Sequence, residues 1–449
     1  MPSSDHAMRT GHHPVALLQQ LIRFDTTNPP GHTAECIGFV DALLTEAGIE
    51  TQIVAQSPEH PNLIARLPGK GDAPPLLLYG HLDVVTTDHQ TWSHPPFEGV
   101  LADGYVWGRG ALDMKGGVAM MLSAFLRAKT EGTELPGDVI FAALSDEESG
   151  GDRGAKFLVE HHPDLFAGVR YAIGEFGGFT LQVGSQRFYL VQVAEKQVCW
   201  LKATFRGAGG HGSMPVRGGA MARMAACIHA LDQQRLPMHL TSTAQQMIET
   251  MAASLEGEEG ALLKRLCDPD VSDKTLESLG ERGRFFDPAL HNTVAPTLVR
   301  GGEAINVIPS EVTLELDGRL LPGYQPDDLI AELRSLIGDD AQLSVTRFDA
   351  GASEPDMGLW DTLTEILHQA DPEATTVPFL LSGVTDGRFF SRLGIQTYGF
   401  LPMPLPKDFN FAQTIHAADE RIPIDALGFG TDAIFTLLQR FHHGDSSEQ

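Results

Sequence analysis

The sequence is poor in cysteine, in positive charge and in long apolar runs. Its four cysteines stand without paired spacing in 449 residues, which excludes a disulfide framework and a cysteine-type zinc site. Lysine and arginine number 32 against 59 acidic residues, and the net charge of -27 argues against nucleic acid or an anionic membrane as partner. No run reaches the ~18 apolar residues of a membrane-spanning helix. Any metal site should therefore be built from histidine and carboxylate side chains.

The N-terminal segment and the chain length bound the location and the number of domains. Residues 1–14 are polar and contain no apolar core of signal-peptide length, so we expect no export. The four scattered cysteines are expected to be reduced and mostly buried thiols, which fits a cytoplasmic location. A chain of 449 residues is too long for one ordinary core, and two domains are expected.

Three apolar runs of strand length are each followed by polar side chains. The runs cover 75–80, 139–144 and 169–173, and the residues that follow them are His81 with Asp83, Glu147 with Glu148, and Glu175. Continuous apolar runs of this length are typical of strands buried on both faces. Because open α/β sheets place ligands at the carboxyl ends of their strands, we expect these side chains to share one edge.

Strands that alternate with helices up to about residue 196 predict an α/β fold with a mostly parallel sheet flanked by helices. From there the order strand, helix, strand, strand, helix, strand predicts a split βαβ, or ferredoxin-like, α+β domain. Its strands are expected at 199–205, 304–308, 312–316 and 342–348, and its helices at 218–233 and 327–337. The predicted domains are 1–196, 197–349 with a helical insertion at about 240–291, and 350–449, which completes the first.

Carboxylates gathered at one edge would repel one another and raise one another's pKa. Asp113, in the loop before a predicted helix, and His416, far along the chain, add to the candidates. A divalent cation removes the repulsion and two remove it better, because one carboxylate can bridge a pair. Glu147 and Glu148 are neighbours whose side chains point opposite ways, so one can bind an ion while the other faces a bound water.

Three ordered blocks resemble the signature segments of the M20 metallopeptidase family. They are Gly80-His-Leu-Asp-Val-Val85, Gly108-Arg-Gly-Ala-Leu-Asp-Met-Lys-Gly-Gly117 and Ser145-Asp-Glu-Glu-Ser-Gly150. The family comprises carboxypeptidases, dipeptidases, aminoacylases and biosynthetic deacylases. The resemblance covers nearly the whole chain and implies a di-zinc catalytic domain with an inserted lid domain.

The resemblance also implies a role for each candidate residue. His81 and Glu175 would bind one zinc, Glu148 and His416 the other, and Asp113 would bridge the two. Glu147 would be the general base, and Asp83 would support His81. Position 175 is aspartate in some members of the family and glutamate in others.

In the second domain the resemblance implies a substrate-binding set. His211 in Gly207-Ala-Gly-Gly-His-Gly-Ser213 would help to polarise the scissile carbonyl. Asn306 and Arg319 would bind substrate, and a guanidinium is suited to bidentate recognition of a free carboxylate. In the loop 382–390, Gly383 would let backbone approach the substrate, while Asp386 and Arg388 are expected to be structural.

We therefore predict a metallohydrolase that holds two zinc ions and cleaves an amide bond next to a free carboxylate, in a small peptide or an N-acyl amino acid. Co²⁺ or Mn²⁺ can substitute for zinc in such sites. Two alternatives stay open: a deacylase dedicated to acetylornithine or succinyl-diaminopimelate, and a metal-containing binding protein without activity. Assembly also stays open: the resemblance implies a homodimer through the lid domain as one outcome, and the insertion before Asn292 that blocks or replaces this contact as the other.

Overall fold

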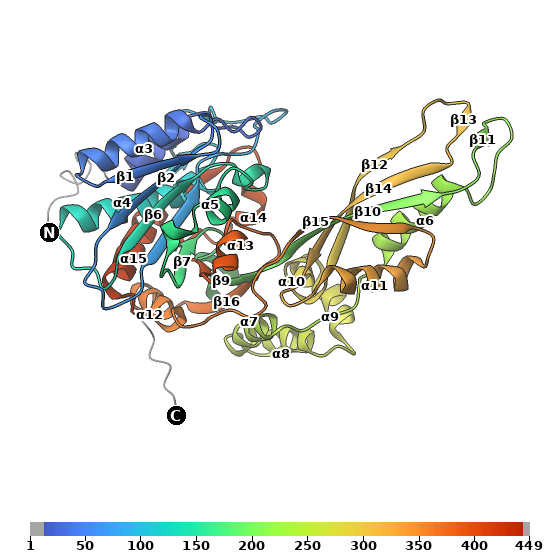
Figure 1. Cartoon of the computed structure of the whole chain (residues 1–449). Coiled ribbons are helices and arrows are strands. Elements are labelled where there is room, and N and C mark those ends of the chain that lie inside the picture. The colour runs from blue at the N-terminus through green and yellow to red at the C-terminus, as the bar shows by residue number, and fades with distance from the viewer. Residues whose placement is uncertain (1–12, 443–449) are drawn as a thin grey trace. The chain divides into compact units, whose positions relative to one another are not determined.

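The computed structural model describes residues 13–442, so most of the predicted polar N-terminal segment lies outside the described residues. The chain divides into two units (Figure 1). Unit 1 contains residues up to 193, 355–379 and from 385, and unit 2 contains 194–354 and 380–384. The short segment 380–384 thus groups with unit 2, whereas the sequence-based division assigns it to the first domain.

Unit 1 is built around a nine-stranded sheet of order β1-β2-β6-β3-β7-β17-β9-β16, with β8 paired to β9. The strands are β1 (Thr51–Ala55), β2 (Pro61–Leu67), β3 (Leu76–His81), β6 (Val139–Leu144), β7 (Tyr171–Gly174), β8 (Phe179–Val183), β9 (Gln186–Glu195), β16 (Thr375–Leu381) and β17 (Gln396–Gly399). The central strands β6, β3, β7 and β17 are parallel, and β2 and β9 run antiparallel beside them. The predicted mixed, mostly parallel sheet is confirmed.

Helices cover both faces of the sheet, and each strand contributes to both cores because its alternate side chains point to opposite sides. Leu76 and Leu78 of β3 join a core with α2 (Pro14–Ile22), α3 (Ala34–Glu46), α4 (Lys115–Thr130), α12 (Trp360–Ala370) and α15 (Ile424–Arg440). Leu77 and Tyr79 join a second core with α5 (Ala155–His161) and α13 (Gly387–Phe390). Burial on both faces explains why these strands read as continuous apolar runs.

A separate small sheet of order β18-β5-β4 lies in unit 1. Its strands are β4 (Val100–Ala102), β5 (Tyr105–Trp107) and β18 (Arg421–Pro423). The antiparallel pairing of β18 with β5 joins the segment after His416 to the segment before Asp113. Two candidate residues that are about 300 positions apart are thereby brought into one neighbourhood.

Unit 2 contains a four-stranded antiparallel sheet of order β12-β14-β10-β15. Its strands are β10 (Gln197–Arg206), β12 (Thr293–Gly301), β14 (Glu311–Leu320) and β15 (Gln342–Asp349), and α6 (Ala220–Gln233) and α11 (Pro326–Ile337) complete its core. The order of elements along the chain is the predicted split βαβ. The insertion forms α7 (Ser242–Ala253), α8 (Glu258–Lys264), α9 (Ser272–Leu279) and α10 (Gly283–Leu290).

The strand expected at 304–308 is wrong. The sheet instead uses 293–301 as β12, and 304–308 contributes only the short β13 (Val307–Ile308), which pairs with β11 (Gly210–His211). β12 is an edge strand that contains Pro296, which is tolerated there because one side of an edge strand makes no ladder hydrogen bonds. Its side chains are largely exposed, so it lacks the apolar pattern of a buried strand.

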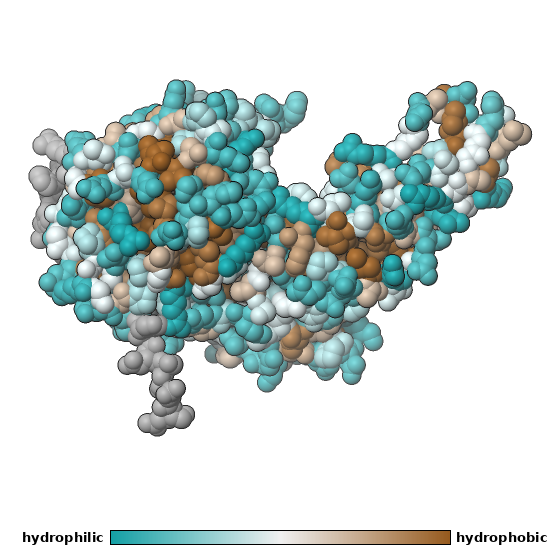
Figure 2. Space-filling model, in the orientation of Figure 1, coloured by the Kyte–Doolittle hydropathy of each residue, from teal (hydrophilic) through white to brown (hydrophobic). Residues whose placement is uncertain are grey.

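Figure 2 shows a mostly polar surface with separate apolar areas. In unit 2, exposed large apolar side chains lie on β12 and around the β11–β13 pair: Met214, Val216, Leu298, Val299, Ile305 and Val307. Within 13–442, no helix combines the length and the apolar character that crossing a membrane requires.

Candidate active site

His81 ends β3 and is held in one orientation by the chain that follows it. Its Nδ1 atom lies 2.9 Å from the backbone carbonyl oxygen of Asp83 and 3.7 Å from the Asp83 carboxylate. The sequence predicts that Asp83 supports His81, and the acceptor in contact with Nδ1 is the backbone carbonyl oxygen of Asp83 and not its carboxylate. Gly80 allows α4 to approach, since a Cβ there would lie 2.8 Å from Cγ2 of Val118. The second ring nitrogen of His81 is left to face the carboxylates.

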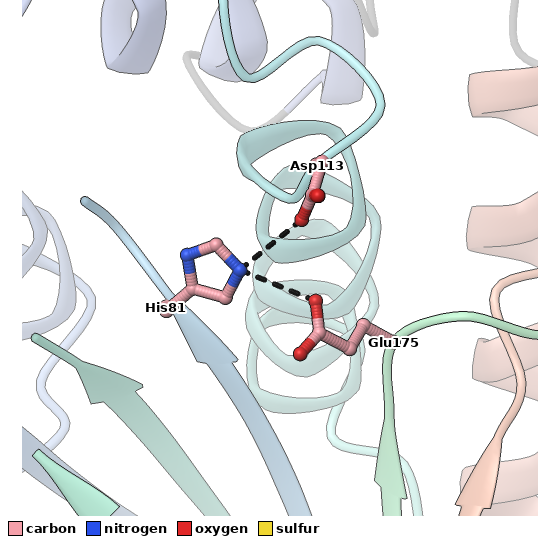
Figure 3. Close-up of side chains that lie close together, drawn as sticks. All are labelled: His81, Asp113 and Glu175. Atoms are coloured by element: carbon pink, nitrogen blue, oxygen red, sulfur yellow. Dashed lines mark hydrogen bonds and ion pairs between the residues drawn. The ribbon is translucent and has the colours of Figure 1, made fainter. Parts of the chain in front are cut away.

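Nε2 of His81 lies 3.2 Å from Oδ1 of Asp113 and 3.2 Å from Oε2 of Glu175 (Figure 3). All three side chains are buried. They come from the end of β3, the loop before α4 and the end of β7, and they point toward one another in Figure 3. A histidine and two carboxylates at this spacing form a set that can hold a metal ion.

A second set shares Asp113 with the first. Nε2 of His416 lies 3.0 Å from Oδ2 of Asp113 and 3.4 Å from Oε2 of Glu148. The ligand atoms within each set all lie within 4.8 Å of one another. His416 has a positive φ of 58°, in the left-handed region that non-glycine residues seldom adopt. Asp113 thus offers one oxygen to each set, as a bridging carboxylate does.

Burial and mutual repulsion perturb the titration of this cluster. Burial raises the pKa of Glu148 to about 8, and repulsion by Asp113 adds to the shift. Burial also raises the pKa of Glu175 well above its usual value, although His81 acts against it. Hydrogen bonds to Asp113 and Glu148 raise the pKa of His416 to about 10. Burial and repulsion therefore disfavour the charged forms of Glu148 and Glu175, and a cation at the centre would favour those charged forms again.

The donor atoms fit a pair of divalent cations. Oε1 of Glu148 and Oε1 of Glu175 are buried and have no hydrogen-bond partner among the described residues. A buried carboxylate oxygen without a partner is costly unless a cation contacts it. Imidazole nitrogen with carboxylate oxygen is a ligand set that suits zinc and its neighbours among the transition metals.

Glu147 lies in the short 3-10 helix Glu147–Ser149 that follows β6. The carboxylate of Asp83 accepts the backbone N–H of Glu147 through Oδ1 and that of Glu148 through Oδ2, both at 3.1 Å. Nη1 of Arg388 lies 3.5 Å from Oε1 of Glu147, and its Nη2 donates to the carbonyl of Gly150 at 3.1 Å. Burial raises the pKa of Glu147. A carboxyl group with a raised pKa is suited to accept a proton near neutrality.

A model of peptidase family M20/M25/M40 matches residues 77–440. The chain belongs to this family. It is 27% identical over 377 residues to the human N-fatty-acyl-amino acid synthase/hydrolase PM20D1, covering 81% of this chain and 74% of that protein. It is 26% identical over 448 residues to aminoacylase-1 of Sus scrofa, covering 96% of each. The membership confirms the predicted hydrolytic, metal-dependent enzyme.

Solved structures share the fold. Human carnosine dipeptidase 1 aligns with a TM-score of 0.67 at 16% identity and covers 97% of this chain and 98% of that one. A dinuclear metal-binding M20 peptidase from Bacillus subtilis aligns with a TM-score of 0.60 at 14% identity, covering 97% and 98%.

The M20 site contains supporting residues that the sequence analysis did not identify. Glu420 is fully buried and accepts hydrogen bonds from the backbone N–H groups of Gly110, Leu112 and Asp113, at 3.0, 2.7 and 3.1 Å. Its Oε2 also pairs with Nη1 of Arg109 at 2.6 Å. Glu420 thereby ties the loop of Asp113 to the segment of His416. Its position four residues after His416 was visible in the sequence, but its partners were not.

The proposed substrate-binding residues lie in unit 2. His211 is exposed on β11 with Nδ1 2.8 Å from Oγ of Ser213, and Asn306 is exposed in the turn before β13. Arg319 on β14 forms two hydrogen bonds to Asp317, from Nε at 2.8 Å and from Nη2 at 3.1 Å. Gly383 lies in the segment 380–384. Their predicted roles are untested by these contacts and remain predictions.

The shared position of Asp113 gives a prediction about metal content. The parent protein should bind two divalent ions per chain, and His416→Ala should retain one because the set around His81 stays complete. Asp113→Ala should retain neither ion firmly. Elemental analysis after dialysis with zinc measures this, and Glu160→Gln, at an exposed ion pair with Arg392, is the control. Two tightly bound ions in Asp113→Ala would contradict the bridging role.

Proposed function

We propose that this M20 enzyme hydrolyses N-acyl amino acids, using two zinc ions and Glu147 as general base. The observation that carries the proposal is that the carboxylate of Asp113 is shared by two histidine-carboxylate sets. Glu147 directly precedes Glu148, which belongs to the second set. The names of the similar proteins PM20D1 and aminoacylase-1, at 27% and 26% identity, favour acyl amino acids over peptides as substrates. Peptides with a free carboxyl terminus present the same bond and are the second candidate.

Some residues of the chain would bind the two metal ions, and others would transfer the proton. His81 and Glu175 would hold one ion, Glu148 and His416 the other, and Asp113 both. Bound zinc supplies a water of lowered pKa and polarises a carbonyl oxygen. Glu147 would accept the proton of the attacking water at its carboxylate and pass it to the leaving amine. Arg388, at 3.5 Å, would keep the Glu147 side chain oriented during that transfer.

Specificity for a free carboxylate would come from unit 2. Arg319 would bind the substrate carboxylate, and its contacts with Asp317 fix the plane of the guanidinium. His211 and Asn306 would contact the scissile carbonyl and the substrate backbone, and Gly383 would let the main chain approach closely. Cobalt or manganese would also suit the donor set. Four free cysteines, three of them buried, support a cytoplasmic location.

The general-base role gives a second prediction. Glu147→Gln should keep both zinc ions and lower kcat by about 10²–10⁴-fold, because proton transfer is removed while the ligands remain. Steady-state hydrolysis of N-acetyl and long-chain N-acyl amino acids, dipeptides, N-acetylornithine and N-succinyl-diaminopimelate measures both the loss and the substrate preference. A parent protein active on one biosynthetic metabolite alone would point to a dedicated deacylase. No turnover of any compound would point to a binding protein.

Recognition of the carboxylate gives a third prediction. Replacing Arg319 by Met should lower kcat/KM for an N-acyl amino acid by about 10–100-fold, since a hydrogen bond to a charged group contributes about 1.5–3 kcal/mol. The same variant should hardly change kcat/KM for the matching N-acyl amino acid amide, which lacks the carboxylate. An equal loss for acid and amide would show that Arg319 serves another purpose.

We propose further that two copies associate through unit 2. β12 is an edge of the four-stranded sheet and exposes Leu298 and Val299, and an exposed apolar edge strand is suited to pairing with another chain. Sedimentation of the zinc-loaded enzyme should give the mass of a dimer, and Val299→Lys should shift it toward monomer. A parent that sediments as a monomer at all accessible concentrations would refute the association.

A further inference from the structure

Asn28 is fixed beside the end of β3 by its own backbone. The segment 26–28 pairs with 82–84, where Thr27 forms a parallel bridge with Val84. The N–H of Asn28 donates to the carbonyl of Val84 at 2.8 Å, and the N–H of Val84 donates to the carbonyl of Thr26 at 3.2 Å. The segment that reads in the sequence as a helix-breaking Thr-Thr-Asn-Pro-Pro-Gly turn thus lies directly against the strand end that carries His81.

The side chain of Asn28 uses its amide hydrogens and its carbonyl oxygen. Nδ2 donates to Oδ2 of Asp83 at 2.8 Å and to Oδ1 of Asp146 at 3.2 Å, and Oδ1 accepts from the hydroxyl of Ser149 at 2.8 Å. Asn28 is 6% exposed. Gly31 makes room for this carboxamide, since a Cβ at that position would lie 2.8 Å from its Cγ.

These three partners enclose the pair Glu147 and Glu148. Asp146 precedes the pair and has a positive φ of 71°, and Ser149 follows it. The carboxylate of Asp83 accepts hydrogen bonds from the backbone N–H groups of both Glu147 and Glu148. Asn28 therefore contacts the residue before the pair, the residue after the pair and the carboxylate that accepts the pair's backbone N–H groups.

Only a side chain with two donors and an acceptor satisfies all three partners. Asp83 and Asp146 each direct a carboxylate oxygen toward Nδ2 of Asn28. Without the two hydrogens of this amide group, the two negative charges would face each other with no donor between them. An aspartate at position 28 has nearly the same shape, but it would replace the donor with a third negative charge.

We infer that Asn28 is a positioning residue that holds the turn carrying Glu147 and Glu148 in the geometry needed for proton transfer and for binding the second metal ion. Its effect on turnover rests on the proposed function. Its effect on metal binding does not, because that can be measured without a substrate. Residues that orient metal ligands typically change metal affinity or activity by about 10–100-fold when they are replaced.

The test compares Asn28→Asp with Asn28→Ala and with Asn292→Asp. Asn292 is also buried and donates to a carboxylate, Glu332, at 3.0 Å, but it lies in unit 2 and is a matched control. Zinc is titrated into each metal-free protein against a chromophoric chelator, which resolves the two equivalents. Both Asn28 variants should bind the second equivalent about 10–100-fold more weakly and the first nearly unchanged, with Asp the more severe.

Turnover of an N-acyl amino acid is measured on the same proteins with zinc in excess. The Asn28 variants should lose kcat by about 10–100-fold with KM nearly unchanged, because the substrate contacts are intact. Asn292→Asp should keep both zinc equivalents and most of kcat. If the parent hydrolyses nothing, the proposed function fails, while the zinc titration still decides the role of Asn28.

Circular dichroism first establishes that each variant folds. Should both Asn28 variants fail to fold, Ser149→Ala decides, because it removes one hydrogen bond at an exposed position. It should weaken the second zinc equivalent by about 2–10-fold, the value of about 0.5–1.5 kcal/mol for one bond. Parent-like binding of the second equivalent in the folded Asn28 variants, or in Ser149→Ala where these do not fold, would overturn the inference.

Discussion

The division of one carboxylate between two histidines is the interaction on which the rest of the site depends. Asp113 presents Oδ1 to His81 at 3.2 Å and Oδ2 to His416 at 3.0 Å, and each histidine faces a further glutamate. Three carboxyl groups in such a small volume are stable only with positive charge among them, because burial weakens hydration and strengthens repulsion. The upward pKa shifts of Glu148 and Glu175 express that imbalance, and a pair of cations would remove it.

The loops that carry these side chains are held by other buried carboxylates and amides. Asp83 accepts the backbone N–H groups of Glu147 and Glu148, and Glu420 accepts those around Asp113. A carboxylate that binds several N–H groups fixes a loop without adding bulk, and it satisfies donors that regular structure leaves unpaired. The site thus combines the ends of buried strands with loops whose backbone N–H groups are hydrogen-bonded to buried carboxylates.

The two units differ in how firmly their candidate residues are held. In unit 1 the metal-binding candidates other than His416, which is 49% exposed, are largely buried and have fixed partners. In unit 2, His211 and Asn306 are exposed, and the guanidinium of Arg319 is hydrogen-bonded to Asp317 of the same strand. The contacts that fix candidate side chains are therefore concentrated in unit 1.

The sequence by itself determined the central strands and the ligand types, because strands buried on both faces leave continuous apolar runs and a polar residue after such a run stands out. It did not predict the edge strand β12, whose exposed side chains and Pro296 carry no such pattern. Tertiary structure alone decided that Asn28 and Glu420 contact the loops of the site, since their partners lie 55 to 121 and 307 to 311 positions away. Hydrogen bonds between segments so distant depend on how the chain packs, and no local periodicity records them.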